Sequence, residues 1–287
     1  MKQVFFLFIS ILFTATVSSQ TLKGIIVDKQ NNTPIIYANI GIVSSAFGCI
    51  SDSNGHFNLH FSSKIDTSSI VRFSMMGYND LQLSLHQAQR FDTIKLDKKD
   101  ILLDEVVIAR KNYSKKKKFG TLKKSKHGIC GWGGTQFGNG HEIGLLIDLG
   151  EKASKIEKLH IRIYKHAFKK SILRLHIRDL KNGLPNNDLL TENVLIPIEK
   201  KSGWITIDLH QYKIFASGKI ALTVEWISAE NVINSRIKTV NKKKTPSILI
   251  YLNKKQGEIF IRKGSEMPWR AFEHQSPNMY IEVKQEA

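Results

Sequence analysis

The sequence predicts an all-β protein made of two antiparallel sandwiches. Short runs of apolar, β-branched and aromatic residues alternate with turn signals along most of the chain, and helical periodicity is nearly absent. A lysine-rich stretch without any acidic residue, at positions 110–126, divides these runs into two regions. The 287 residues fit one large or two ordinary domains, and an apolar fraction of 41% is sufficient for packed cores.

Turn signals delimit the strands of the first region. Asn54-Gly55 lies between residues 48–51 and the alternating segment 57–61. Asn-Gly accepts the positive φ angles of a tight turn, so these two segments are predicted to form a β-hairpin. The remaining strands of this region are predicted at residues 35–43, 70–76, 81–85, 91–96 and 105–108, with one turn of helix at 86–90.

Several ordered motifs in residues 21–108 resemble the carboxypeptidase regulatory-like domain. They are Gly24 with Asp28, Thr33-Pro34-Ile35, Ala38-Asn39-Ile40, Gly48 with Asp52, Gly55 and Phe57, and Phe73 to Tyr78. The resemblance implies a seven-stranded, transthyretin-like sandwich without peptidase chemistry. It is typical of exported proteins of Bacteroidetes-type bacteria, including TonB-dependent outer-membrane receptors. Residues 103–108 are similar to the segment that leads into the plug of such receptors.

The first 19 residues have the pattern of a secretory signal peptide. Lys2 precedes an apolar run, and Val17-Ser18-Ser19 provides small or tolerated residues before a cleavage point at Gln20. The apolar run is shorter than the roughly 20 residues that span a bilayer, and no later run approaches that length. The sequence therefore predicts an exported protein that is periplasmic, associated with the outer membrane or secreted, without a transmembrane span in the mature chain.

Charge defines the middle of the chain. Residues 20–109 are expected to form the first domain, residues 110–127 a basic linker and residues 128–287 the second domain. A block of like charges stays solvated, so a linker is the main interpretation; a tether to anionic surface lipid or polysaccharide is the alternative. Nucleic-acid binding is not predicted, because only Tyr113 and Phe119 are interleaved with the lysines and the protein is expected to be exported.

The second region predicts about eight or nine strands, which fit an antiparallel, jelly-roll-like sandwich. Residues 173–178 alternate strictly between apolar and basic side chains. The strands are expected at 142–149, 156–165, 171–179, 193–198, 203–209, 217–227, 246–252, 257–262 and 278–284.

No catalytic, cofactor or metal motif is complete. The glycine-dense stretch 128–144 lacks the lysine of a phosphate loop and the third glycine of a dinucleotide site. There is no Gly-x-Ser-x-Gly elbow and no zinc motif, so the histidines, among them His160, His166 and His176, are interpreted as surface residues. Acidic residues such as Asp188, Glu192, Asp208 and Glu225 are interpreted as turn or rim residues, and Cys49 and Cys130 as small, partly buried thiols whose pairing stays open.

Aromatic residues give the better indication of binding. Trp204 and Trp226 are attributed to core or sheet-edge packing. The predicted ligand-binding residues are Trp132 in the glycine-rich stretch and Arg262, Trp269 and Arg270 in or beside a later loop, because a ring can stack on a ligand while a charge orients it.

Together these patterns predict an exported, non-catalytic binding or assembly module of the cell envelope. Its expected partners are a glycan, an anionic envelope surface or an outer-membrane protein. Two alternatives remain open: a polysaccharide or peptidoglycan hydrolase using carboxylates such as Glu225, Glu258 and Glu273, and an accessory protein of a TonB-dependent receptor.

Overall fold

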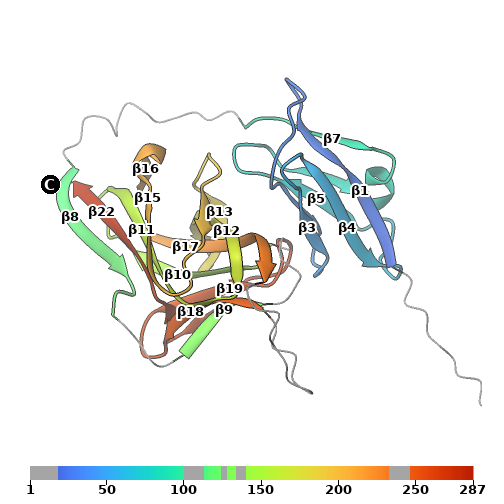
Figure 1. Cartoon of the computed structure of the whole chain (residues 1–287). Helices are drawn as coiled ribbons and strands as arrows, with labels where there is room; N and C mark the ends of the chain where they lie inside the picture. The colour runs from blue at the N-terminus through green and yellow to red at the C-terminus, as the bar shows by residue number, and fades with distance from the viewer. Residues whose placement is uncertain (1–18, 100–112, 124–127, 134–139, 233–245, 287) are drawn as a thin grey trace, which may run out of the picture.

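The predicted all-β fold is confirmed. The computed structural model describes residues 19–99, 113–123, 128–133, 140–232 and 246–286, which form two β-rich units lying side by side (Figure 1). Apart from the short helices α1 (Leu85–Ala88) and η1 (His210–Tyr212), the regular elements are strands. None of the helices in this described part of the chain is long and apolar enough to cross a membrane.

The first unit is a seven-stranded sandwich of one three-stranded and one four-stranded sheet, with strand orders β4-β1-β7 and β3-β2-β5-β6. Its core lies between the sheets and includes Ile26, Leu59, Ile40 and Phe73. The strands are β1 (Ser19–Asp28), β2 (Asn39–Ile42), β3 (Gly48–Ile50), β4 (His56–Ser62), β5 (Ile70–Ser74), β6 (Leu81–Ser84) and β7 (Thr93–Leu96).

The Asn54-Gly55 turn forms, but the hairpin predicted around it does not. Gly55 has a φ of 78°, and its N–H donates to Asp52 O at 3.1 Å. However, β3 pairs with β2 in one sheet, whereas β4 pairs with β1 in the other. The chain changes sheets at this turn because β4 must direct its alternate apolar residues into the shared core.

The second unit packs two larger sheets against each other. The seven-stranded sheet, which we call the cleft sheet, has the order β13-β12-β17-β10-β19-β20, with β14 beside β12. Its strands are β10 (Glu142–Asp148), β12 (Phe168–Lys181), β13 (Leu184–Asp188), β14 (Leu195–Ile198), β17 (Lys219–Val232), β19 (Glu258–Arg262) and β20 (Arg270–Glu273).

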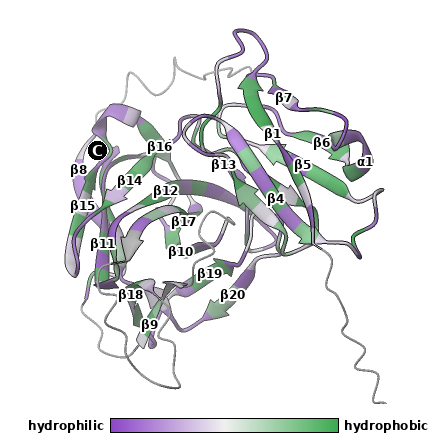
Figure 2. Cartoon of the chain, turned by 45° about the vertical axis from the view of Figure 1, so that its right-hand side comes forward, coloured by the Kyte–Doolittle hydropathy of each residue, from purple (hydrophilic) through white to green (hydrophobic). Residues whose placement is uncertain are grey.

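The eight-stranded sheet, which we call the outer sheet, has the order β21-β18-β11-β22-β8, with β15 and β16 beside β11 and β9 beside β18. Figure 2 shows the hydrophobic positions (green) in the strands of both units, and those of the second unit form one core between its sheets. The strands are β8 (Tyr113–Gly120), β9 (Gly128–Gly133), β11 (Ser154–His166), β15 (Gly203–Asp208), β16 (Ile214–Ala216), β18 (Ser247–Asn253), β21 (Ser276–Pro277) and β22 (Met279–Glu286).

All of the strands predicted in the second region are present, but part of the expected linker at 110–127 is a strand. β8, at Tyr113–Gly120, pairs antiparallel with β22 and extends the outer sheet. Lysine-rich strands are well suited to sheet edges, because their charge opposes pairing with another chain. The sequence missed β8 because its run of lysines has no apolar alternation to mark one face.

Trp132, one of the predicted ligand-binding residues, is a core residue. It is fully buried on β9, where it packs with Ile143 and Ile248, and its indole N–H donates to His141 O at 2.9 Å. Cys130 on the same strand and Cys49 on β3 are free thiols that pack against different cores. Burial raises the pKa of each thiol to about 12, so both are inert, uncharged side chains at neutral pH.

Replacing Trp132 should therefore lower stability. Trp132→Ala leaves a large cavity between the sheets and is expected to reduce the free energy of unfolding by about 3–5 kcal/mol. Trp132→Phe keeps most of the packing and should cost less. Denaturant unfolding followed by far-UV circular dichroism measures both changes, and an unaltered midpoint for Trp132→Ala would contradict the core assignment.

Candidate binding cleft between the two units

The face of the cleft sheet that points away from the core of the second unit meets the first unit. Along β12, Leu173, Leu175 and Ile177 point into the core of the second unit, so the alternate residues Arg174, His176 and Arg178 point away from it. All three of these polar residues are nevertheless buried. Their side chains lie beneath the first unit or among the other charged residues of the cleft sheet.

Specific contacts join the units at this face. The Arg174 guanidinium donates from Nη1 to Tyr37 O at 2.7 Å and from Nη2 to Asn39 Oδ1 at 3.3 Å. Arg72 on β5 forms an ion pair with Glu266 of the second unit, at 3.5 Å between Nη1 and Oε2. Met76 of the first unit also packs against the core of the second.

Two glycines allow this close approach. A Cβ atom on Gly41 would lie 2.5 Å from Cγ of Glu266, and one on Gly77 would lie 2.8 Å from the carbonyl oxygen of Thr191. A larger residue at Gly41 would force the Glu266 side chain to move, and one at Gly77, where φ is 81°, would be strained and would meet the backbone of the second unit.

A cleft of about 660 Å³ lies beside this contact and is lined by both units. Its walls are mainly polar. They also include the indole ring of Trp269, which belongs to the second unit. The first unit contributes Asn39, Arg72, Ser74, Asp80 and Lys99 among others, and the second contributes Arg174, His176, Arg178, Asn186, Asn187, Asp188, Arg262, Glu266 and Trp269.

A row of charged residues crosses the cleft sheet behind this wall. In register across β12, β17, β10 and β19, the row reads Arg174, Glu225, Glu142 and Arg262. Both carboxylates are fully buried and lie directly opposite each other, an arrangement in which like charges repel. The row is therefore stable only if the flanking cations, and groups between the carboxylates, compensate for this repulsion.

Arginines bind the outer side of each carboxylate. Arg174 donates from Nε to Glu225 Oε2 at 2.8 Å. Arg178 donates from Nη2 to Glu142 Oε1 at 3.0 Å, and Arg262 donates to the same oxygen. These charge-assisted bonds satisfy most of the ionic groups that the sheet buries.

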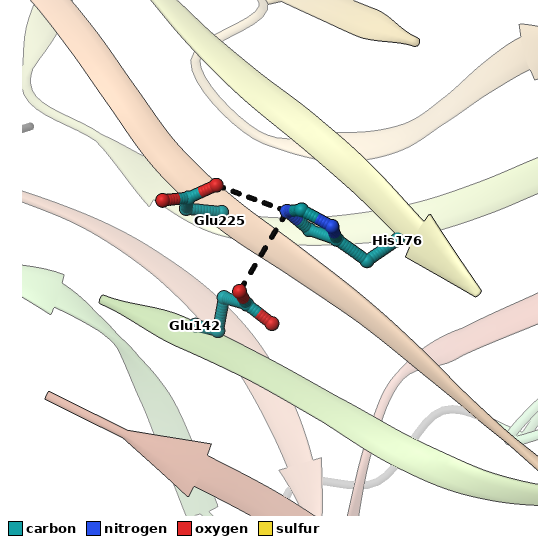
Figure 3. A group of neighbouring side chains, drawn as sticks. All are labelled: Glu142, His176 and Glu225. Atoms are coloured by element: carbon teal, nitrogen blue, oxygen red, sulfur yellow. Dashed lines mark hydrogen bonds and ion pairs between the residues drawn. The ribbon is translucent and has the colours of Figure 1, made fainter. Parts of the chain in front are cut away.

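His176 lies between the two glutamates (Figure 3). Its Nε2 is 2.9 Å from Glu225 Oε2 and 3.6 Å from Glu142 Oε1, while its Nδ1 pairs with Asp188. Arg178 Nη2 also lies 3.1 Å from Nδ1 and opposes a positive charge on the ring, but the carboxylates at both ring nitrogens outweigh it and favour the doubly protonated imidazolium.

The pKa values of these groups follow from the pairing. Burial alone would lower the pKa of His176, but Glu142 and Asp188 raise it above its ordinary value of 6.5. Burial likewise opposes ionisation of Glu225, yet Arg174 and His176 lower its pKa to about 2. The pKa of Glu142 is also held well below its usual value, because the charges of Arg178 and Arg262 outweigh its burial.

Glu142, His176 and Glu225 have the residue types of a metal site, with ligand atoms within 4.8 Å of one another. Their surroundings do not fit a divalent cation. Three arginine guanidinium groups already contact the same carboxylates, and a metal would also have to displace the Nε2 proton of His176. The arrangement favours a buried salt-bridge network.

Of the four predicted ligand-binding residues, the structure brings two together. The Arg262 guanidinium carbon lies 4.8 Å from the centre of the Trp269 ring, and that of Arg178 lies 5.9 Å from it. Arg270 is exposed on β20 and does not line the cleft. Trp132 is in the core, as described above.

The sequence-based interpretation missed the other residues of the site. His160, His166 and His176 are buried and are not surface residues, and Glu225 lies in mid-strand and not at a rim. The alternation at residues 173–178 was the available signal, but it does not identify which strands or which unit cover the polar face.

The network predicts a specific pH dependence of stability. Because the folded pKa of His176 is raised, its stabilising contribution is complete below about 6.5 and declines as the pH rises through the folded value. The paired glutamate Glu225 acts in the opposite direction, and its contribution is lost as the pH falls from 4.5 towards about 2.

His176→Gln should therefore destabilise the protein more at pH 5.5 than at pH 8.5, as measured by denaturant unfolding at each pH. His274→Gln is the matched control, since that side chain is exposed. A stability difference between wild type and His176→Gln that does not change with pH would show that the imidazolium is not part of the network.

Comparisons with known proteins agree with the description of the first unit. Residues 22–108 match the family model of the CarboxypepD_reg-like domain. No match is found among curated proteins.

Among solved structures, two of the cysteine protease Cwp84 align with low similarity. The first contains the cysteine protease and lectin-like domains of Cwp84, a surface layer associated protein of Clostridium difficile; it is 11% identical with a TM-score of 0.39, over 86% of this chain and 58% of that one. The second, clostridial Cwp84 after propeptide cleavage, is 10% identical with a TM-score of 0.41, over 93% of this chain and 70% of that one. This chain thus spans 58% of the length of the first structure.

The family match confirms the resemblance inferred from the sequence motifs: this chain contains a CarboxypepD_reg-like domain, matched over residues 22–108.

Proposed function

We propose that this protein is an exported, non-catalytic binding module of the cell envelope that holds a saccharide in the cleft between its two units. The observation that carries the proposal is the cleft itself. Its volume of about 660 Å³ falls within the range of small-molecule sites, and residues from both units line it.

Unsatisfied polar atoms support a ligand at this position. Within the described residues, Nε of Arg178, Nε of Arg262 and Oγ of Ser265 are buried and have no hydrogen-bond partner. All three residues line the cleft. Such atoms are costly to bury unless a ligand or water bonds to them.

The mixture of charges favours a hydroxylated ligand. The cations of the cleft are largely matched by carboxylates, as in the pairs of Arg178 with Glu142 and of Arg72 with Asp80. A strongly charged ligand would have to compete with these pairs. Sugar hydroxyls can both donate and accept, and amide groups such as those of Asn186 and Asn187 complement them.

Export, and a location in the periplasm, at the outer membrane or outside the cell, belong to this proposal. They are supported by the signal-peptide pattern of residues 1–19, of which only Ser19 is among the described residues. The division into domains at 20–109 and 128–287 also stays a proposal. A role beside a TonB-dependent receptor is a further prediction, and the 103–108 segment on which it is based lies outside the described residues.

Trp269→Ala tests the cleft. If a sugar ring packs against this indole, a saccharide identified on a glycan array should bind the variant about tenfold more weakly, a change of about 1.4 kcal/mol. Isothermal titration of the full chain measures the affinity. Phe91→Ala is the matched control because Phe91 is an exposed aromatic residue of the first unit that does not line the cleft. Equal affinities of wild type and Trp269→Ala would exclude the cleft.

The hydrolase alternative has less support. Glu225 and Glu142 are ionised by their arginine partners, whereas a general acid needs a raised pKa. Glu258 and Glu273 pair at the far end of β19, away from Glu225. Among the cleft carboxyls, Glu266 has a pKa that burial raises despite the charge of Arg72.

We therefore expect the purified protein to release no product from envelope polysaccharide or peptidoglycan. Reducing-end and mass-spectrometric assays measure this. Turnover that is lost in Glu266→Gln but retained in Glu273→Gln would replace the binding proposal with a hydrolase acting in the cleft.

A further inference from the structure

A second polar surface lies on the opposite side of the second unit. In β11, Leu159, Ile161 and Ile163 point into the core, so the alternate residues face away from the cleft sheet. The outward positions of β11 and its neighbours carry aromatic rings and cations, which we call the outer strip. It consists of Lys118, Arg162, Tyr164, Trp204, Tyr251 and Tyr280.

The rings of the outer strip form a continuous series of contacts. Tyr164 and Tyr251 meet edge to face, with centroids 5.2 Å apart, and Trp204 meets Tyr280 in the same way at 5.2 Å. The Arg162 guanidinium carbon joins the two pairs, at 4.7 Å from the Tyr251 centroid and 5.6 Å from that of Trp204. At the other end, Lys118 Nζ lies 5.5 Å from the centre of Tyr280.

Parts of the strip remain available to a ligand. Tyr164 is 44% exposed, and Trp204, Tyr251 and Tyr280 are only partly buried. Arg162 is also only partly buried, so part of its guanidinium can reach a ligand. Exposed rings that lie next to one another on a surface are typical of an interaction site.

Lysines flank the strip and give it an excess of positive charge. One cross-strand row places Lys116, Lys284 and Lys155 next to one another. The adjacent row reads Lys118, Glu282, Lys158 and Asp208. Part of this charge is neutralised within the chain, because Glu157 pairs with Lys155 and Lys284 at 3.0 and 3.3 Å and Glu282 pairs with Lys118 at 2.9 Å. Together with Arg162, the lysines of the two rows still outnumber the carboxylates Glu157, Glu282 and Asp208, and this excess favours an anionic partner.

We propose that the outer strip binds a linear acidic polysaccharide, with carboxylates paired with Arg162 and the flanking lysines and with sugar rings packed on the exposed parts of the aromatic side chains. Tyr164 offers the most exposed ring, whereas one face of Tyr280 is already stacked on His160 at 4.2 Å between centroids. Sugar hydroxyls can donate hydrogen bonds to Glu282 and Asp208, which phosphate groups cannot do, and this favours a saccharide with widely spaced carboxylates over a nucleic acid. This site is separate from the cleft and does not depend on the function proposed there.

Polygalacturonate fragments are the probe, and their methyl esters are the uncharged control. By isothermal titration of the full chain, we expect the acid to bind, the ester to bind at least tenfold more weakly, and added salt to weaken the acid further. Arg162→Gln and Tyr164→Ala should each reduce the affinity for the acid by roughly tenfold. Lys64→Gln, an exposed lysine of the first unit, controls for the loss of one positive charge.

The alternative results are distinct. No binding of the acid, or unchanged affinity in both Arg162→Gln and Tyr164→Ala, would overturn the inference. Oligothymidylate binding as tightly as the acid would reassign the strip to single-stranded nucleic acid. Loss of binding only in Trp269→Ala would move the ligand to the cleft, which overturns the outer strip but leaves the proposed function in place.

Discussion

The structure depends on the neutralisation of two carboxylates buried side by side in one sheet. Glu142 and Glu225 occupy neighbouring strands in register, and both side chains are fully buried. Removing a charged group from water costs several kcal/mol unless it is paired. The strand order of the cleft sheet provides the partners, because it places β12 and β19, with Arg174 and Arg262, on the two flanks.

The same constraint links the second unit to the first. After Arg174 has bound Glu225, its remaining N–H groups must still be satisfied, and Tyr37 and Asn39 of the first unit accept hydrogen bonds from them. The first unit thus accepts hydrogen bonds from Arg174, a charged residue of the second unit. The same network reaches the cleft, since Arg178 and Arg262 both donate to Glu142 and both lie against the ring of Trp269.

Local pattern was sufficient to predict the all-β class and the nine strands expected in the second region, but it missed the strands β8, β9, β13, β16, β20 and β21 and did not predict the site. The alternation at residues 173–178 correctly indicated one apolar and one polar face, yet the polar face was expected at the surface because a strand does not reveal what covers it. Glu142, His176, Asp188 and Glu225 are far apart in sequence and complete no motif. Arg262 and Trp269 were identified because they are close in sequence, whereas Trp132, also in a glycine-rich segment, proved to be a core residue.

The two sheets of the second unit show why cross-strand neighbours decide the role of a polar face. β11 and β12 have nearly the same alternation, with Arg162 in one and Arg174 in the other pointing out of the core. Arg174 has Glu225 opposite it, and the ion pair between them neutralises its charge. Arg162 has Trp204 opposite it, and among the described residues its guanidinium lies against rings and not against a carboxylate. One guanidinium therefore joins the two units, while the other is the cation on which the proposed outer site depends.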